Sequence, residues 1–210
     1  MYSDKCLGGA LYRFLRCQKR RRKRYGTHSR RGGIPHQVSI DDRPAIVAAK
    51  QRLGDWEGDT VIGKAPRGAL VTLVERTSLS MVMQHVGRKT AALVRSAVHQ
   101  GLAPYKDRVQ TITYDNGREF ADHEGMAKDL AAKIYFAHPY ASWERGLNEN
   151  TNGLIRQYFP KSRNLTTVTE TEMDYASNQL NHRPRKTLEF KTPYEVFFNT
   201  KTSLTVALQG

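Results

Sequence analysis

Apolar and polar residues alternate along most of the chain in a pattern that predicts a mixed α/β domain. Strands are expected where apolar residues recur at every second position, and helices where they recur at every third or fourth. This places strands at residues 56–62, 69–75, 80–86, 109–114 and 133–137, and helices at 90–101, 124–132 and 144–159. An antiparallel meander extended by parallel strands is the simplest sheet for this order. Gly101 is expected to stop the first helix.

Three carboxylates occupy positions that suggest one common site. Asp59 lies in the first predicted strand, Asp115 directly follows an alternating strand, and Glu149 lies in the last predicted helix. Asp115 therefore stands at the carboxyl end of a strand, where open α/β sheets bind their ligands. Oxygen ligands from separate elements suit hard divalent cations such as Mg²⁺, for which a phosphodiester is a natural substrate. Each carboxylate also has a simpler interpretation as a turn residue or a solvated charge.

The identity of the functional carboxylate on the first strand has two alternatives. Asp55 and Glu57 share the face of Asp59, because side chains two residues apart point to the same side of a strand. Val61 and Ile62 follow Asp59, which predicts that Asp59 lies closest to the buried centre of the sheet. An unpaired carboxylate there is costly and usually has a purpose, so we favour Asp59.

The predicted helix at residues 144–159 carries Glu149 on a polar face. Asn152 and Arg156 follow at helical spacing, so a carboxylate, an amide and a guanidinium line up on one side. Asn152 and Arg156 could orient Glu149 or contact a phosphate, and the whole face could equally be solvated. Two further candidates for contacts with a nucleic-acid backbone follow this helix: Lys161 and Arg163.

The loop before this helix contains Trp143, with His138 and Tyr140 close by in sequence. An aromatic side chain in such a loop could stack on unpaired bases near a cut strand. Packing is the commoner role of loop aromatics, and packing is what we expect here.

Positive charge is concentrated at the start of the chain. The whole chain has a net charge of +14, and residues 1–36 contain eleven Lys or Arg against the single acid Asp4, which gives +10. Such an arm attracts polyanions, so it is expected to bind nucleic acid, although a solubilising tail is an alternative. The densest run of candidate DNA-binding residues is Lys19, Arg20, Arg21, Arg22, Lys23 and Arg24.

Residues 1–36 are predicted to be a basic helical arm and linker, and residues 37–202 a single domain. Apolar residues between Leu7 and Leu15 recur at helical spacing, which predicts a short amphipathic helix with little partner surface of its own. Residues 25–37 are rich in Gly, Arg and His, as is typical of a linker. We therefore interpret the arm as the remnant of an upstream region.

Composition excludes several other classes of protein. The only two cysteines, Cys6 and Cys17, lie in the arm. A disulfide framework for the domain is thus excluded, and a reducing compartment is expected. The seven histidines show no paired spacing that would indicate a zinc site. No apolar run approaches the length of a membrane span, so no membrane partner is expected.

Taken together, the three acidic segments resemble a known protein family. The chain is similar to insertion-sequence transposases of the DDE type in the IS-thirty family, whose core is like that of retroviral integrases. The resemblance covers roughly residues 30–199. It rests on Trp56 and Asp59; on Asp115, Asn116, Gly117, Glu119 and Phe120; on Gly146, Glu149 and Asn152; and on Asn181, Arg183, Pro184, Leu188, Thr192 and Pro193.

The resemblance implies a ribonuclease H-like fold, a five-stranded mixed sheet flanked by helices. In that fold the first and fourth strands are parallel neighbours, so Asp59 and Asp115 would lie about 5 Å apart. Asp59 would bridge two Mg²⁺ ions, for which Mn²⁺ can substitute, while Asp115 and Glu149 would each hold one.

The implied activity is metal-dependent cleavage of DNA at the ends of an insertion element, followed by transfer of the freed 3′-hydroxyl to target DNA. The implied partners are both DNAs and further copies of the chain assembled on them. Family members carry an upstream helix-turn-helix region, which leads us to expect an amino-terminal truncation. The alternatives are a non-catalytic nucleic-acid-binding protein and an inactive transposase remnant.

Overall fold

The computed structural model describes residues 7–10, 33–65, 67–139 and 141–200. The described residues from 33 onward belong to one compact unit. The basic run at residues 19–24 and both cysteines lie outside the described residues. Leu7 is 88% exposed and begins a turn, so the predicted amphipathic helix is not present in the part of the arm that is described.

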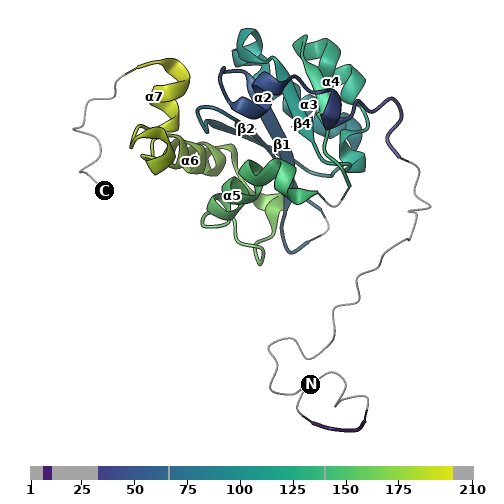
Figure 1. Ribbon diagram of the computed structural model, residues 1–210. Helices are drawn as coiled ribbons and strands as arrows, with labels where there is room; N and C mark the ends of the chain where they lie inside the picture. The colour runs from purple at the N-terminus through teal and green to yellow at the C-terminus, as the bar shows by residue number, and fades with distance from the viewer. Residues whose placement is uncertain (1–6, 11–32, 66, 140, 201–210) are drawn as a thin grey trace, which may run out of the picture. The chain divides into compact units, whose positions relative to one another are not determined.

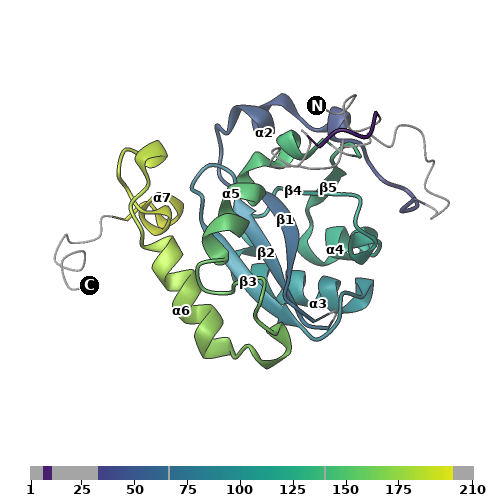
Figure 2. The same cartoon turned by 90° about the horizontal axis from the view of Figure 1, so that it is seen from below.

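The domain is built on one five-stranded mixed sheet (Figures 1 and 2). Its strands lie in the order β3-β2-β1-β4-β5. The first three strands form an antiparallel meander, and β4 and β5 extend it in parallel. The predicted strand order and sheet type are therefore confirmed. The strand bounds are β1 (Asp55–Ile62), β2 (Ala69–Glu75), β3 (Met81–Val86), β4 (Thr111–Tyr114) and β5 (Lys133–Phe136).

Helices cover both faces of this sheet (Figure 2). The α-helices are α2 (Ala45–Ala49), α3 (Ala91–Leu102), α4 (His123–Leu130), α5 (Gly146–Ile155), α6 (Glu170–Asn181) and α7 (Pro193–Phe198). Short 3₁₀ turns are η2 (Ile40–Asp42), η3 (Ala103–Arg108), η4 (Arg118–Phe120), η5 (Ser142–Arg145), η6 (Leu165–Thr167) and η7 (Lys186–Leu188).

The sheet separates two hydrophobic cores. One core contains Trp56 together with residues of α3 and α4, and the other contains Val61 together with residues of α5 and α6. Every residue of the interior strand β2 is buried, because both of its faces pack against helices. Odd-numbered residues of β1 point toward α5, and Trp56 points to the opposite side. Asp59 therefore faces the helix that carries Glu149.

Two helix ends differ from the sequence expectation. Gly101 does not stop α3, which continues to Leu102 and into η3. A Cβ at Gly101 would lie 2.9 Å from Cγ1 of Val82, so this glycine permits close packing of α3 on β3. The helix that carries Glu149, α5, begins at Gly146 and ends at Ile155. It is therefore shorter at both ends than the predicted helix at residues 144–159.

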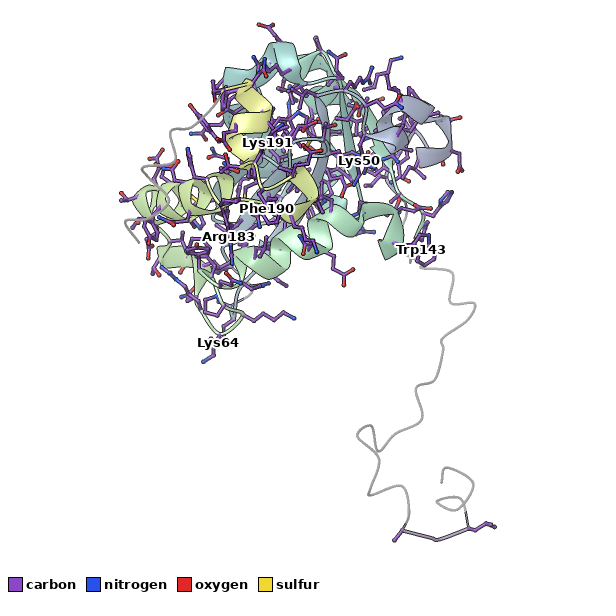
Figure 3. All side chains as sticks on the ribbon, turned by 60° about the vertical axis from the view of Figure 1, so that its left-hand side comes forward. Lys50, Lys64, Trp143, Arg183, Phe190 and Lys191 are labelled. Carbon is purple, nitrogen blue, oxygen red and sulfur yellow. The ribbon has the colours of Figure 1, made fainter. Side chains whose placement is uncertain are left out.

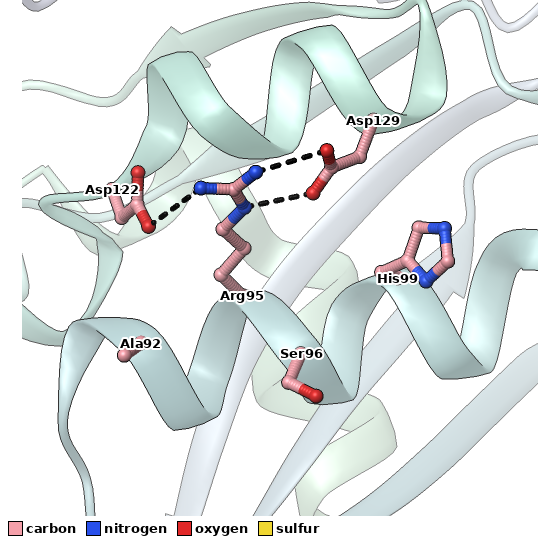
Figure 4. Close-up of a pocket in the computed structure, with 6 residues that line it drawn as sticks. All are labelled: Ala92, Arg95, Ser96, His99, Asp122 and Asp129. Atoms are coloured by element: carbon pink, nitrogen blue, oxygen red, sulfur yellow. Dashed lines mark hydrogen bonds and ion pairs between the residues drawn. The ribbon is translucent and has the colours of Figure 1, made fainter.

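The helices α3 and α4 are joined by a group of ion pairs. Arg95 donates to both oxygens of Asp129, at 2.7 and 2.9 Å, and to Asp122 at 3.2 Å (Figure 4). These groups line a shallow pocket with His99, on the side of the sheet opposite to α5. Within the described ranges no helix is long and apolar enough to cross a membrane.

Candidate functional site

Parallel pairing of β1 with β4 brings Asp59 beside Asp115. Glu57 is paired with Thr113 in this ladder, so the residues two positions later, Asp59 within β1 and Asp115 directly after β4, stand at the same level on neighbouring strands. Adjacent strands are about 4.8 Å apart. The predicted relationship between these two strands is therefore confirmed.

Glycines shape the backbone on both sides of this pair. A Cβ at Gly58 would overlap the buried ring of Tyr114, so only glycine fits between β1 and that ring. A Cβ at Gly117 would lie 2.9 Å from Oδ1 of Asp115. The Gly117 amide donates to that same oxygen at 2.9 Å, which orients the carboxylate at the start of the turn. Asp115 thus forms both the predicted turn and a part of the candidate site.

Asn152 connects α5 to the first strand. Its Nδ2 donates to Oδ2 of Asp59 at 2.8 Å, and its Oδ1 accepts a longer contact from the Thr72 hydroxyl at 3.3 Å. The backbone amide of Thr60 donates to the other oxygen of Asp59 at 2.8 Å. Asp59 is thus held in one orientation by groups from β1 and α5.

The burial argument that favoured Asp59 is wrong. Asp55 and Glu57 are each 1% exposed, whereas Asp59 is only half-buried. The strand is most deeply covered at its first half, and the two alternatives are already paired there. Asp55 bonds to Arg52 and to Thr111, and Glu57 forms an ion pair with Arg76. Of the three, Asp59 is the carboxylate that stands beside Asp115.

The ionisation of Asp59 is affected by this environment. Burial raises the pKa of Asp59, and the negative charge of Asp115 raises it further. The guanidinium of Arg145 and the hydrogen bonds from Thr60 and Asn152 have the opposite effect and lower the pKa of Asp59. Two adjacent carboxylates repel each other unless a cation compensates them. The electrostatics of the pair therefore favour a bound positive charge.

In this structure Arg145 supplies that positive charge. Its Nη2 lies 3.3 Å from Oδ2 of Asp115, and its Nη1 donates to the Gly58 carbonyl at 3.0 Å. The Arg145 side chain is only 12% exposed. Sequence reasoning did not single out Arg145. The only signal was a cation four residues before Glu149, which is one helical turn away.

Glu149 is not gathered with the other two carboxylates. It is exposed at the first turn of α5, and it forms no hydrogen bond or ion pair with the described residues. No group of three or more His, Cys, Asp or Glu side chains in the described segments is arranged to hold a metal ion. Glu149 does lie three residues before Asn152, so their Cβ atoms are about 5–6 Å apart on one helix face.

The chemistry of the donors nevertheless fits a hard divalent cation. Asp59 and Asp115 offer carboxylate oxygens side by side, and the position they share already attracts a guanidinium. Glu149 stands on the neighbouring helix, one turn before the amide that contacts Asp59. A fourth carboxylate, that of Glu119, is committed elsewhere, because it accepts from Thr60 at 2.9 Å and pairs with Lys89 at 2.5 Å.

The other residues predicted to contact DNA are in varied settings. Arg156 donates to the Ile62 carbonyl at 2.8 Å and so ties α5 to the end of β1. Arg163 forms an ion pair with Glu172 at 2.6 Å. Lys161 is exposed and has no ion pair within the described part of the chain. DNA binding by Asn152, Arg156, Lys161 and Arg163 stays a prediction, as it does for Lys19 to Arg24.

The loop between β5 and α5 is braced by His138. Its Nδ1 lies 2.8 Å from Glu144, its Nε2 lies 3.0 Å from Asp41, and its backbone amide donates to Glu144 at 2.9 Å. Trp143, carried by this loop, is 77% exposed. The expectation that Trp143 packs is therefore wrong, because the short η5 turn holds it outside both cores (Figure 3).

Comparison with known proteins shows a clear similarity to insertion-sequence transposases. A family model described as "Integrase core domain" matches residues 49–142, a span that includes Asp59 and Asp115 and ends before Glu149. The chain is 46% identical to the transposase of insertion sequence element IS4351 from Bacteroides fragilis, over 94% of this chain and 61% of that protein. It is 38% identical to the InsI transposase of element IS30C from Escherichia coli, over 80% of this chain and 45% of that protein.

The fold matches as well. The HTLV-2 integrase catalytic core domain in complex with magnesium superposes with a TM-score of 0.55 and 20% identity, covering 70% of this chain and 97% of that one. The predicted ribonuclease H-like fold is thereby confirmed. The chain spans about half to three fifths of the length of these two curated relatives. By sequence and by fold, the chain is similar to the IS-thirty (IS30) group of insertion-sequence transposases, and its residues 49–142 match an integrase core domain.

Proposed function

We propose that this chain performs the metal-dependent DNA strand cleavage and 3′-hydroxyl strand transfer of an insertion-sequence transposase. The observation that supports this most directly is the side-by-side placement of Asp59, within β1, and Asp115, directly after the parallel neighbouring strand β4. Relatives are named as transposases, and a protein of the same fold is described in complex with magnesium. The proposal extends those activities to this chain.

Each of the three carboxylates has a separate role in the proposal. Asp59 is held by Asn152 and Thr60 so that its oxygens face the position it shares with Asp115. Asp115 is held by the Gly117 amide. Glu149 is exposed and unpaired in the described part of the chain, so it is free to turn toward the site when substrate arrives.

The residues fit Mg²⁺, which Asp59, Asp115 and Glu149 would hold as two ions, with Mn²⁺ as a substitute. Bound there, divalent ions would lower the pKa of an attacking hydroxyl and stabilise the leaving oxygen of an in-line displacement. Asn152 keeps Asp59 in the orientation that this requires. Arg145 would have to leave Asp115, and its guanidinium would then be available to a DNA phosphate.

Strand cleavage with defined variants tests the proposal. We expect Asp59→Asn, Asp115→Asn and Glu149→Gln each to abolish Mg²⁺-dependent nicking and joining of a plasmid or oligonucleotide, since members of a catalytic unit act together. The matched control is Asp174→Asn, which changes an exposed carboxylate on α6 and should retain activity. Unchanged nicking by the Asp59→Asn and Asp115→Asn proteins would disprove the site, and DNA binding without any nicking would favour a non-catalytic protein.

DNA is the proposed partner, and the basic arm is its proposed point of non-specific attachment. Each phosphate contact that is lost should reduce the slope of log binding constant against log salt by about 0.9. Replacing Lys19 through Arg24 by Gln should therefore flatten the slope and weaken binding equally on random and terminal-repeat duplexes. A persistent preference for the repeats would show that the core itself reads base sequence.

Two further parts of the proposal concern assembly and location. The related integrase core domain is described in a trimeric form, and we propose that this chain also multimerises on DNA. The described domain contains no cysteine, which agrees with a reducing compartment, and we propose the bacterial cytosol. Light scattering of the chain with and without a DNA duplex measures the first of these.

A further inference from the structure

The chain contains two tryptophans with opposite environments. Trp56 is fully buried against Phe197 in the core, whereas Trp143 is 77% exposed. Figure 3 shows Trp143 projecting from the ribbon at the amino-terminal end of α5. A single exposed aromatic is common on protein surfaces and is not evidence of a site by itself. Two further observations suggest a role for Trp143: the fixed turn that carries it and the carboxylate site close to that turn.

Trp143 is carried on a turn that is fixed on both sides. Before it, Ala141 is buried, and its carbonyl accepts from the amide of Glu144 at 3.1 Å. After it, the carboxylate of Glu144 is bonded to both the ring and the backbone of His138. His138 in turn reaches Asp41 at 3.0 Å. The indole is therefore presented by a pre-organised turn rather than by a loose loop.

The turn also places Trp143 beside the carboxylate site. Arg145 is two residues further on, so their Cα atoms are at most about 7 Å apart. Arg145 contacts both Asp115 and the Gly58 carbonyl, next to Asp59. A flat, exposed, pre-organised aromatic surface thus stands at the edge of the position where the proposed function puts the scissile phosphate.

We propose that Trp143 stacks on a nucleobase of the DNA strand whose phosphate lies at Asp59 and Asp115. This rests on the proposed function and deepens it, because it assigns a positioning residue for the substrate. A base freed from its pair at the strand end has an exposed π-face, and stacking on an aromatic side chain recognises any of the four bases. The occupant is nucleic acid rather than a second copy of the chain, because a net charge of +14 attracts polyanions and repels another copy.

Intrinsic fluorescence tests this, because Trp143 is the exposed tryptophan and Trp56 supplies a buried background. The probe is a duplex of arbitrary sequence with a few unpaired bases at one 3′ end, and EDTA prevents cleavage. We expect the emission of the wild-type protein to be quenched to saturation by this DNA. The Trp143→Phe protein, which retains only Trp56, should show little change.

Affinity gives a second, independent measurement. Trp143→Ala should weaken binding of the open-ended duplex by about 5- to 150-fold, with a smaller effect on a fully paired, blunt hairpin. Trp143→Phe should recover part of the loss, since a smaller ring still stacks. The matched control is Tyr175→Ala, which removes a 61% exposed aromatic from α6, the helix that packs against β3. Its binding should equal that of the wild type.

The outcomes separate this inference from the function on which it rests. Nicking that requires Asp59 and Asp115, combined with no fluorescence response and equal affinities, would overturn the role of Trp143 and leave the function standing. Loss of nicking in every preparation, with Trp143 still quenched by DNA, would count against the catalytic function alone. Emission that depends on protein concentration without DNA would overturn the inference in favour of an interface between copies.

Discussion

Arg145 places its Nη2 3.3 Å from Oδ2 of Asp115, so a guanidinium compensates the charge at the point where Asp59 and Asp115 meet. A divalent ion shared by these carboxylates competes for the same oxygen. The two carboxylates are thus held by an arginine from the loop before α5, and a divalent ion bound between them would have to displace it.

Arg145→Gln should therefore tighten metal binding. Removing the competing cation leaves two carboxylates whose repulsion only an added ion can relieve. We expect the dissociation constant for Mn²⁺, measured by calorimetry or by electron paramagnetic resonance, to fall by about 1.5- to 5-fold, the scale of one partly exposed ion pair. The control is Arg156→Gln. Arg156 stands at the other end of α5 and donates to the Ile62 carbonyl rather than to a carboxylate. Weaker Mn²⁺ binding by Arg145→Gln would show that Arg145 supports the ion instead of competing with it.

Asp59→Asn should stabilise the metal-free protein while removing its activity. Burial raises the pKa of Asp59, so the contribution of this group to stability is present at low pH and is lost as pH rises through the raised pKa. At neutral pH the ionised form is the costly one. The neutral amide keeps an oxygen to accept from Asn152, and each 1 kcal/mol gained raises the melting temperature by about 2–4 °C. A lower melting temperature without metal, measured by calorimetry, would contradict this.

Glu57→Gln should fail through stability rather than through chemistry. Glu57 is 1% exposed and the Arg76 side chain 8%, so removing one charge leaves the other buried without a partner. Breaking such a pair costs about 3–5 kcal/mol. Replacing both members, as Glu57→Gln with Arg76→Met, should recover much of the loss, because no buried charge then remains. Full stability of the single variant would show that the Glu57–Arg76 ion pair does not contribute to stability.

The loop that carries Trp143 should respond to pH through His138. The hydrogen bond to Glu144, and the charges of Asp41 and Glu144, raise the pKa of His138 above its ordinary value. The brace is therefore complete below a pH of about 6.5 and weakens as pH rises through the higher pKa of the folded protein. Polarisation of the exposed Trp143 emission should fall over that interval. His138→Gln should abolish the change, whereas His99→Gln, on α3, should preserve it.

Much of the fold follows from local pattern. Alternation before Asp115 predicts β4, and the apolar run at residues 69–74 predicts β2. Helical spacing predicts α3, at whose start the Thr90 hydroxyl accepts from the Leu93 amide. Patterns of this kind act over a few residues, so they can be read without knowledge of the partners. Gly101 was misread for the same reason, since its role is set by Val82 on another element.

The sequence by itself determined that Asp59 lies in one strand and that Asp115 directly follows another, because the residues around them have the pattern of strands. Only the tertiary structure decided which carboxylate of β1 is available. Asp55 accepts a hydrogen bond from the Thr111 hydroxyl and Glu57 is paired with the Arg76 guanidinium, residues that are 56 and 19 positions away. The exposure of Trp143 and the approach of Arg145 to Asp115 were likewise decided by packing between distant segments, which no local spacing encodes.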